Sequence, residues 1–328
     1  MDDQPPRPSL LRRLWPYLKW AFFVLVLYFV ARRAVQLWNS APAESIQVNG
    51  YWLIPAVLTY LIGWLPSVWF WRAMLRAMRQ PLGWMDAIRA HYVGQVGKYI
   101  PGKGLVLVIR GSLVKNAGVN PILGGVTAAY EALVFMAAGA ALGLALAPIA
   151  FGDSFWKQIP TQLLWLRDQP ILVPLLVFAL NFATTPISAW LFTRMGQKTM
   201  KQTRADNSDL PSISAALVAK GVAITSLGWF CHAISLGCVI QSVATKPMDV
   251  KQFPIWLAAT TLSTVGGFVI LIAPGGIGVR EGLLIEVLKN QPDLGPTLAV
   301  VVAGLLRAVW FVTELITAAL LYVTRRRA

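Results

Sequence analysis

The sequence predicts an all-α polytopic integral membrane protein, and three observations lead to this fold class. First, 56% of the 328 residues are hydrophobic and only 13% are charged, against about 25% charged in a typical soluble domain. Second, the apolar residues are grouped in blocks of roughly 20 residues, the length that crosses a bilayer. Third, 29 Lys and Arg outnumber 14 Asp and Glu, and their uneven distribution along the chain is typical of membrane topology. Disordered chains and disulfide scaffolds are excluded by the apolar content and by the two cysteines.

Six apolar blocks are predicted to span the membrane, and two further stretches are short or interrupted. The six lie at about 15–38, 51–71, 122–147, 170–192, 216–243 and 297–323, and the other two at about 90–114 and 253–290. The first block also resembles a signal peptide, with Ala41-Pro42-Ala43 as a cleavage site. Arg32 and Arg33 lie between the apolar run and that site. They favour an uncleaved anchor whose Arg side chains reach the interface.

The positive charges predict the orientation of these spans. With the N-terminus in the cytoplasm, 20 of the 29 Lys and Arg fall on the cytoplasmic side and 7 on the other side. This asymmetry is the one that cytoplasmic loops show, so we expect both termini inside. The net charge of +15 therefore marks topology rather than a nucleic-acid partner, which we do not expect.

The orientation constrains the two interrupted stretches. Residues 72–121 begin and end on the cytoplasmic side, and residues 244–296 begin and end outside. Each region must therefore cross the membrane an even number of times, either as a full helical hairpin or as a re-entrant pair. The sequence leaves these two alternatives open.

Both interrupted stretches contain a Pro-Gly break. The first reads Gly97-Lys98-Tyr99-Ile100-Pro101-Gly102-Lys103-Gly104, and the second Ala273-Pro274-Gly275-Gly276-Ile277-Gly278-Val279-Arg280-Glu281-Gly282. The order of spans and breaks divides a single transmembrane domain, 1–328, into two pseudo-repeats at approximately 15–147 and 170–323. The halves enter the membrane from opposite sides, which is typical of inverted-topology repeats.

These breaks predict where a ligand would bind. Pro and Gly end a helix, and unpaired backbone groups at membrane depth are tolerated only within protein or beside a wet cavity. The helix that follows each break directs its N-terminal amides toward that cavity, which favours an anion. The alternative is a plain surface loop with a Pro-Gly turn.

Charged residues at membrane depth give a second indication of a central cavity. Glu131 lies within one span, and Arg307 and Glu314 within the last; such residues normally face the interior of a bundle and have partners. We expect Glu131 and Glu314 to balance Arg280 and Arg307 around the cavity, with Glu131 close to Arg307. The alternative is a structural ion-pair network. For Arg280 we favour phosphate recognition, because an Arg just past a Gly-rich helix start suits bidentate contacts.

No catalytic constellation stands out, so we do not expect an enzyme. His91 and His232 are not accompanied by the acidic spacing motif of a metal site, and there is no nucleotide-binding P-loop. We therefore expect no metal and no cofactor. Glu131 or Glu314 would be candidate proton carriers if movement were coupled to a gradient.

The two break motifs, with Arg110, resemble the signature segments of the lysylphosphatidylglycerol synthase transmembrane (flippase-like) family. The resemblance covers about 15–323, and the second motif is the more specific. It implies that the domain moves a phospholipid between leaflets. The chain ends at Ala328, after its last span, so we expect a stand-alone member without the synthase domain. The candidate substrate-binding residues are Lys98, Pro101, Gly102, Lys103, Arg110, Glu131, Pro274, Gly275, Gly276, Gly278, Arg280, Glu281, Arg307 and Glu314.

Two functions remain in view. The first is a lipid translocator in a bacterial inner membrane, moving a phosphate-containing lipid or lipid-linked headgroup, with a phospholipid or polyprenyl-linked lipid as partner. Lys98, Lys103 and Arg110 around the first break would help to hold the phosphate, or would only mark the cytoplasmic side. The second is a non-transporting scaffold or accessory subunit for a separate lipid- or glycan-modifying enzyme.

Overall fold

A computed structural model describes residues 47–99, 104–202, 212–244, 246–247, 249–270, 276–291 and 294–324, together with Tyr28, Arg32 and Val35. Within these residues all regular structure is helical, which confirms the predicted fold class. Apart from those three residues, the predicted span 15–38 lies outside the described residues. The same is true of Pro101, Gly102, Lys103, Pro274 and Gly275 from the two breaks.

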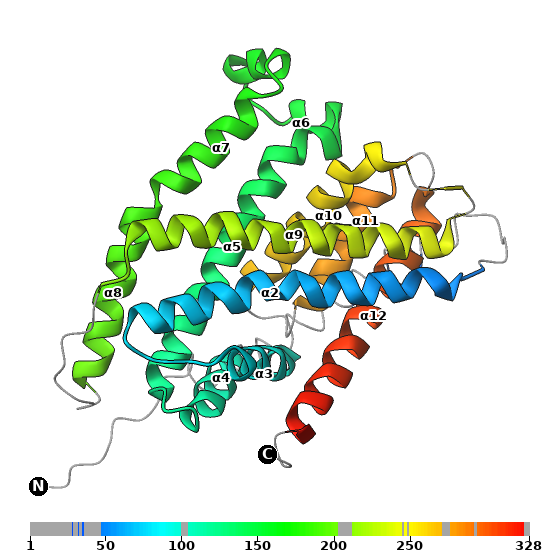
Figure 1. The fold of residues 1–328 in the computed structure, drawn as a ribbon. Helices are drawn as coiled ribbons and strands as arrows, with labels where there is room; N and C mark the ends of the chain where they lie inside the picture. Colours follow the sequence, from blue (N-terminus) through cyan, green and yellow to red (C-terminus); the bar gives the residue numbers. More distant parts are fainter. Residues whose placement is uncertain are drawn as a thin grey trace, which may run out of the picture.

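Long helices account for the other five predicted spans. They are α2 (Leu53–Ala77), α5 (Pro121–Phe151), α7 (Leu172–Ala183) with α8 (Thr185–Gln202), α9 (Ala215–Val243) and α12 (Gly295–Val323) (Figure 1). Five segments of these helices are long and apolar enough to cross a bilayer: Gly50–Ala77, Pro121–Phe151, Leu172–Lys198, Ala215–Val243 and Gly295–Val323. The outward faces carry large apolar side chains, such as Leu180 and Ile187. The chain is therefore a multi-pass membrane protein.

Local sequence explains where these helices begin. Asn120 accepts hydrogen bonds from the backbone N–H groups of Ile122 and Leu123 at the start of α5, and Pro121 occupies a position that needs no donor. Ser214 caps α9 in the same way through the N–H of Leu217. The shorter elements are η1 (Gly50–Trp52), α6 (Asp153–Trp156), η3 (Thr161–Asp168) and η4 (Val250–Gln252).

The two interrupted stretches form pairs of short helices. The first pair is α3 (Trp84–Gln95) and α4 (Leu105–Lys115), with the turn η2 (Val96–Tyr99) after α3; the second is α10 (Phe253–Val269) and α11 (Val279–Leu288). Helices α3, α4 and α11 have 12, 11 and 10 residues, fewer than the roughly 20 that a crossing needs, whereas α10 with 17 residues is at the lower limit of that length. The lengths favour re-entrant pairs over full hairpins, an alternative that the sequence left open.

Helices α2 and α9 lie side by side and antiparallel, and they cross α5 and α12 steeply (Figure 1). Ser235 Oγ donates to the carbonyl oxygen of Ala56 at 2.8 Å. About two helical turns further along, Gly63 faces Gly228. A Cβ added to Gly228 would collide with the Gly63 carbonyl oxygen. Small residues therefore let the two backbones approach closely.

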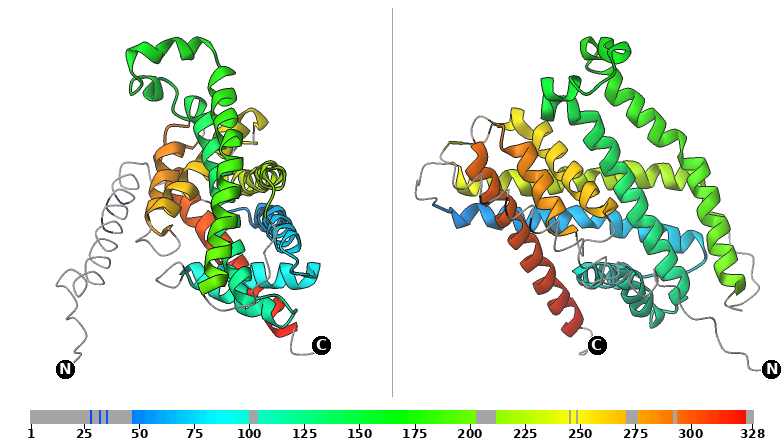
Figure 2. Two further views of the ribbon diagram at one scale, coloured as in Figure 1. Left: turned by 90° about the vertical axis from the view of Figure 1, so that its left-hand side faces the viewer. Right: turned by 180° about the vertical axis from the view of Figure 1, so that it is seen from behind.

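The helix contacts occur in matching pairs. Helix α10 packs on α5 as α3 packs on α12, and α4 packs on α5 as α11 packs on α12. In the views of Figure 2, α3 and α4 lie at the lower end of the molecule and α10 and α11 in its upper half. In an inverted repeat, corresponding helices of the two halves make corresponding contacts, as these pairs do. The repeat itself stays a prediction.

Candidate functional site

A cavity of about 380 Å³ lies where helices of the two halves meet. Its lining comes from α2, η2, α4 and α5 in the first half and from α9, α10, α11 and α12 in the second. The polar and aromatic groups that face it include Trp64, Lys98, His232, Thr264, Arg280 and Trp310. The rest of the lining is mainly apolar, so the few polar groups would orient a ligand.

Stacked aromatic rings build one wall of the cavity. Tyr60 stacks on Trp310 with ring centroids 4.4 Å apart, and His232 lies 5.0 Å from Trp64 and 5.5 Å from Trp310. Gly63 makes room for the histidine, because a Cβ there would lie 2.6 Å from His232 Nε2. Three buried polar atoms on this lining, Trp64 Nε1, His232 Nε2 and Thr264 Oγ1, have no hydrogen-bond partner.

Arg280 lies in the first turn of α11, directly after the second break. Gly278 has φ +89° and Gly276 φ +70°, conformations that favour glycine, and they end the break and begin the helix. A Cβ added to Gly267 of α10 would lie 3.2 Å from the Cβ of Arg280, so the glycine lets the two helices pack closely. The guanidinium Cζ lies 4.2 Å from the centroid of the Trp310 ring. Among the described residues, no carboxylate is within ion-pair distance of Arg280.

Lys98 and Glu314 join the halves beside the cavity. Lys98 belongs to η2, where Gly97 packs so closely on α4 that a Cβ would lie 2.8 Å from the Val106 nitrogen. Glu314 of α12 accepts hydrogen bonds from Lys98 Nζ and from the hydroxyl groups of Tyr60 and Tyr99, the last at 2.8 Å. The expectation that Glu314 is near the cavity is compatible with this position, but its partner is Lys98.

Arg307 and Glu281 form a second ion pair near the cavity. Arg307 Nε lies 3.5 Å from Glu281 Oε1, and the other carboxylate oxygen accepts the Gly278 N–H at 2.6 Å. Glu281 therefore caps α11 and neutralises Arg307 at the same time. The Arg307 guanidinium also lies 5.2 Å from the centroid of the Tyr99 ring.

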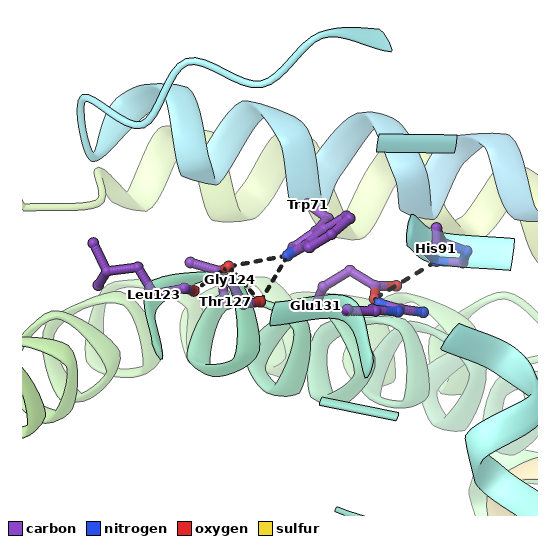
Figure 3. Close-up of polar contacts among 7 residues, drawn as sticks. Trp71, His91, Leu123, Gly124, Thr127 and Glu131 are labelled. Carbon is purple, nitrogen blue, oxygen red and sulfur yellow. Dashed lines mark hydrogen bonds and ion pairs between the residues drawn. The ribbon is translucent and has the colours of Figure 1, made fainter. Parts of the chain in front are cut away.

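Arg110 and Glu131 form a separate buried cluster with His91 (Figure 3). Arg110 Nη1 lies 2.6 Å from Glu131 Oε2, and His91 Nε2 lies 3.8 Å from the same oxygen. Figure 3 also shows Trp71, which donates to Thr127 Oγ1 at 3.0 Å and packs beside this cluster. The expected proximity of Glu131 to Arg307 is wrong: α4, the arm after the first break, supplies the partner of Glu131, and Glu281 is the partner of Arg307.

Sequence reasoning missed the aromatic and neutral part of the site. The candidate residues predicted from the sequence did not include Tyr60, Trp64, Tyr99, His232 or Thr264. Tyr60 and Trp64 are four residues apart, so they share a helix face, and Tyr99 follows Lys98 in the first break. That spacing was the available signal, but aromatic residues at helical spacing are common in any packed bundle.

A family model described as "Lysylphosphatidylglycerol synthase TM region" matches residues 16–318. This match confirms the resemblance that the break motifs carried. No curated protein sequence matches the chain significantly.

Proposed function

The chain belongs to the lysylphosphatidylglycerol synthase transmembrane region family, and from this premise we propose that it translocates a phosphate-containing lipid between the leaflets of the membrane. The observation that carries the proposal is Arg280. Its guanidinium faces an intramembrane cavity without a carboxylate partner among the described residues. Arg geometry matches the oxygens of a phosphate group.

An apolar groove beside the cavity supports a lipid rather than a small soluble anion. The groove has a volume of about 770 Å³ and lies between α4, α5, α7, α8 and α9. It shares Leu107, Ala129 and Leu133 with the lining of the cavity. A headgroup in the cavity would therefore have an adjoining apolar space for its acyl or prenyl chains.

The contacts between the halves support a route for movement. Lys98 from the first half is paired with Glu314 from the second. A rotation of one half against the other would therefore separate this pair. In transporters with inverted repeats, such motion exposes a central site to each side in turn. We place the protein in a bacterial inner membrane with both termini in the cytoplasm, on the positive-charge asymmetry of its loops.

Purified protein in vesicles tests the proposal. A fluorescent phosphatidylglycerol should move between leaflets faster in vesicles that contain the protein than in empty ones. Arg280→Ala should slow that movement about tenfold, because one hydrogen bond to a charged group contributes about 1.5–3 kcal/mol. Arg194→Ala is the matched control, since Arg194 also stacks on a tryptophan, 4.4 Å from the Trp190 centroid, but on an exposed surface. Equal rates in protein-containing and empty vesicles would contradict translocation and favour the scaffold alternative.

A further inference from the structure

The carboxylates near the cavity have partners of their own. Glu314 is 3% exposed, and its two oxygens accept hydrogen bonds from Lys98, Tyr60 and Tyr99. Glu281 is held by the N–H of Gly278 and by Arg307. No Asp or Glu is among the described residues that line the cavity. The segments 100–103 and 271–275, which complete the two breaks, contain no acidic residue in their sequence.

The cations are arranged differently. Lys98 and Arg280 both line the cavity. Lys98 is paired with Glu314, and Arg307 with Glu281, whereas Arg280 has no ion-pair partner among the described residues. Trp64 Nε1, His232 Nε2 and Thr264 Oγ1 are buried polar atoms without partners on the same lining. The indole N–H and the hydroxyl are donors, and the imidazole becomes one in the appropriate tautomer.

We propose that this cavity selects a lipid headgroup with net negative charge, a phosphodiester or phosphomonoester without a compensating ammonium, over zwitterionic and cationic headgroups. The inference rests on the proposed function and names its substrate class. An ammonium group entering the cavity would meet Lys98 and Arg280, and it would find no carboxylate among the described lining residues. A buried charge without a partner is strongly disfavoured. A lysyl-phosphatidylglycerol headgroup, which carries two ammonium groups and one phosphate, is therefore a poor ligand for this chain.

Lipid retention by the purified protein tests the selectivity without requiring transport. The probes are dioleoyl lipids with identical chains, carrying phosphatidylglycerol, phosphatidylcholine or lysyl-phosphatidylglycerol headgroups, and native mass spectrometry of equimolar mixtures measures the bound fraction of each. Wild-type protein should retain phosphatidylglycerol about tenfold more than either competitor, which corresponds to about 1.4 kcal/mol. Equal retention, or preference for the lysyl lipid, would overturn the inference.

Two variants and one control show which residues determine the selectivity. Arg280→Gln should abolish the preference, and Arg194→Ala should keep it. Lys98→Gln removes the cation bound to Glu314 and frees that carboxylate, so retention of the lysyl lipid should rise relative to wild type. A variant at Lys98 that still rejects the lysyl lipid would contradict the charge argument, even if the Arg280 variant failed to fold.

A competitor and a comparison with the vesicle assay distinguish a failure of the selectivity from a failure of the proposed translocation. Inorganic phosphate is added as a competitor; if it displaces phosphatidylglycerol at equal concentration, the site binds free anions and the lipid part of the inference is wrong. If selective retention is observed but vesicles show no movement of lipid, the selectivity stands and the proposed translocation fails. If all three headgroups move and bind equally, translocation stands and the selectivity fails.

Discussion

Glu131 and Arg110 are 1% and 3% exposed and are paired inside the bundle. Glu131→Gln should leave the Arg110 guanidinium without its counter-charge, and breaking a buried pair costs about 3–5 kcal/mol. Thermal unfolding in detergent should therefore occur at a clearly lower temperature than for wild type. Asp153→Asn is the control, because it removes an ion pair in which the Asp153 and Arg167 side chains are 72% and 56% exposed. Such exposed pairs contribute about 0–1 kcal/mol.

The double variant Arg110→Met with Glu131→Leu decides whether this pair is structural. Replacing both charges with apolar side chains leaves neither charge buried without its counter-charge, so the unfolding temperature should recover relative to Glu131→Gln. Lipid movement at the wild-type rate would then assign the pair to structure rather than substrate contact. A double variant as unstable as the single one would contradict the explanation.

These residues also show what the sequence could predict about the candidate site. The high cost of charge at membrane depth selected Arg307 and Glu314, and the second break motif selected Arg280 and Glu281; these four residues lie on or near the cavity. Their roles as substrate contacts stay predictions. The ion-pair partners could not be predicted from sequence, because they depend on which helices face each other. Glu131 was expected close to Arg307, yet α4 packs on α5 and supplies Arg110.

Helices α2 and α9 pack closely on each other, and both contribute side chains to the lining of the cavity. Gly228→Ala should destabilise the protein by about 1–3 kcal/mol, because the new methyl group would meet the Gly63 carbonyl oxygen in a filled interface. Gly304→Ala on α12 is the matched control: nothing lies within 4 Å of its added Cβ, so its stability should be unchanged or slightly higher. Thermal unfolding of the two variants compares them directly, and equal unfolding temperatures would contradict the close approach of α2 and α9.

Most of the fold could be predicted because bilayer crossing imposes a length and a composition that are visible in sequence. Five of the six predicted spans are confirmed, including the last, predicted at 297–323 and found in α12. The short helices α3, α4 and α11 could not be delimited in this way. Their ends depend on backbone turns at Gly97 and Gly278 and on tertiary packing against α4 and α10, rather than on hydropathy.

For the whole molecule, the predicted orientation of the spans can be tested by labelling. In a background where Cys231 and Cys238 are replaced by serine, single cysteines are introduced at two exposed loop positions, Asn116 between α4 and α5 and Asp249 between α9 and α10. A membrane-impermeant maleimide added to intact cells should label Asp249→Cys but not Asn116→Cys, because three candidate spans lie between the two positions and an odd number of crossings puts them on opposite sides. Gly104→Cys, at the start of α4, should also stay unlabelled from outside, since helices of 12 and 11 residues are too short to bring the first break to the far face. Labelling of Gly104→Cys from outside would mean that α3 and α4 cross fully, and labelling of Asn116→Cys from outside would reverse the orientation that the positive charges predict.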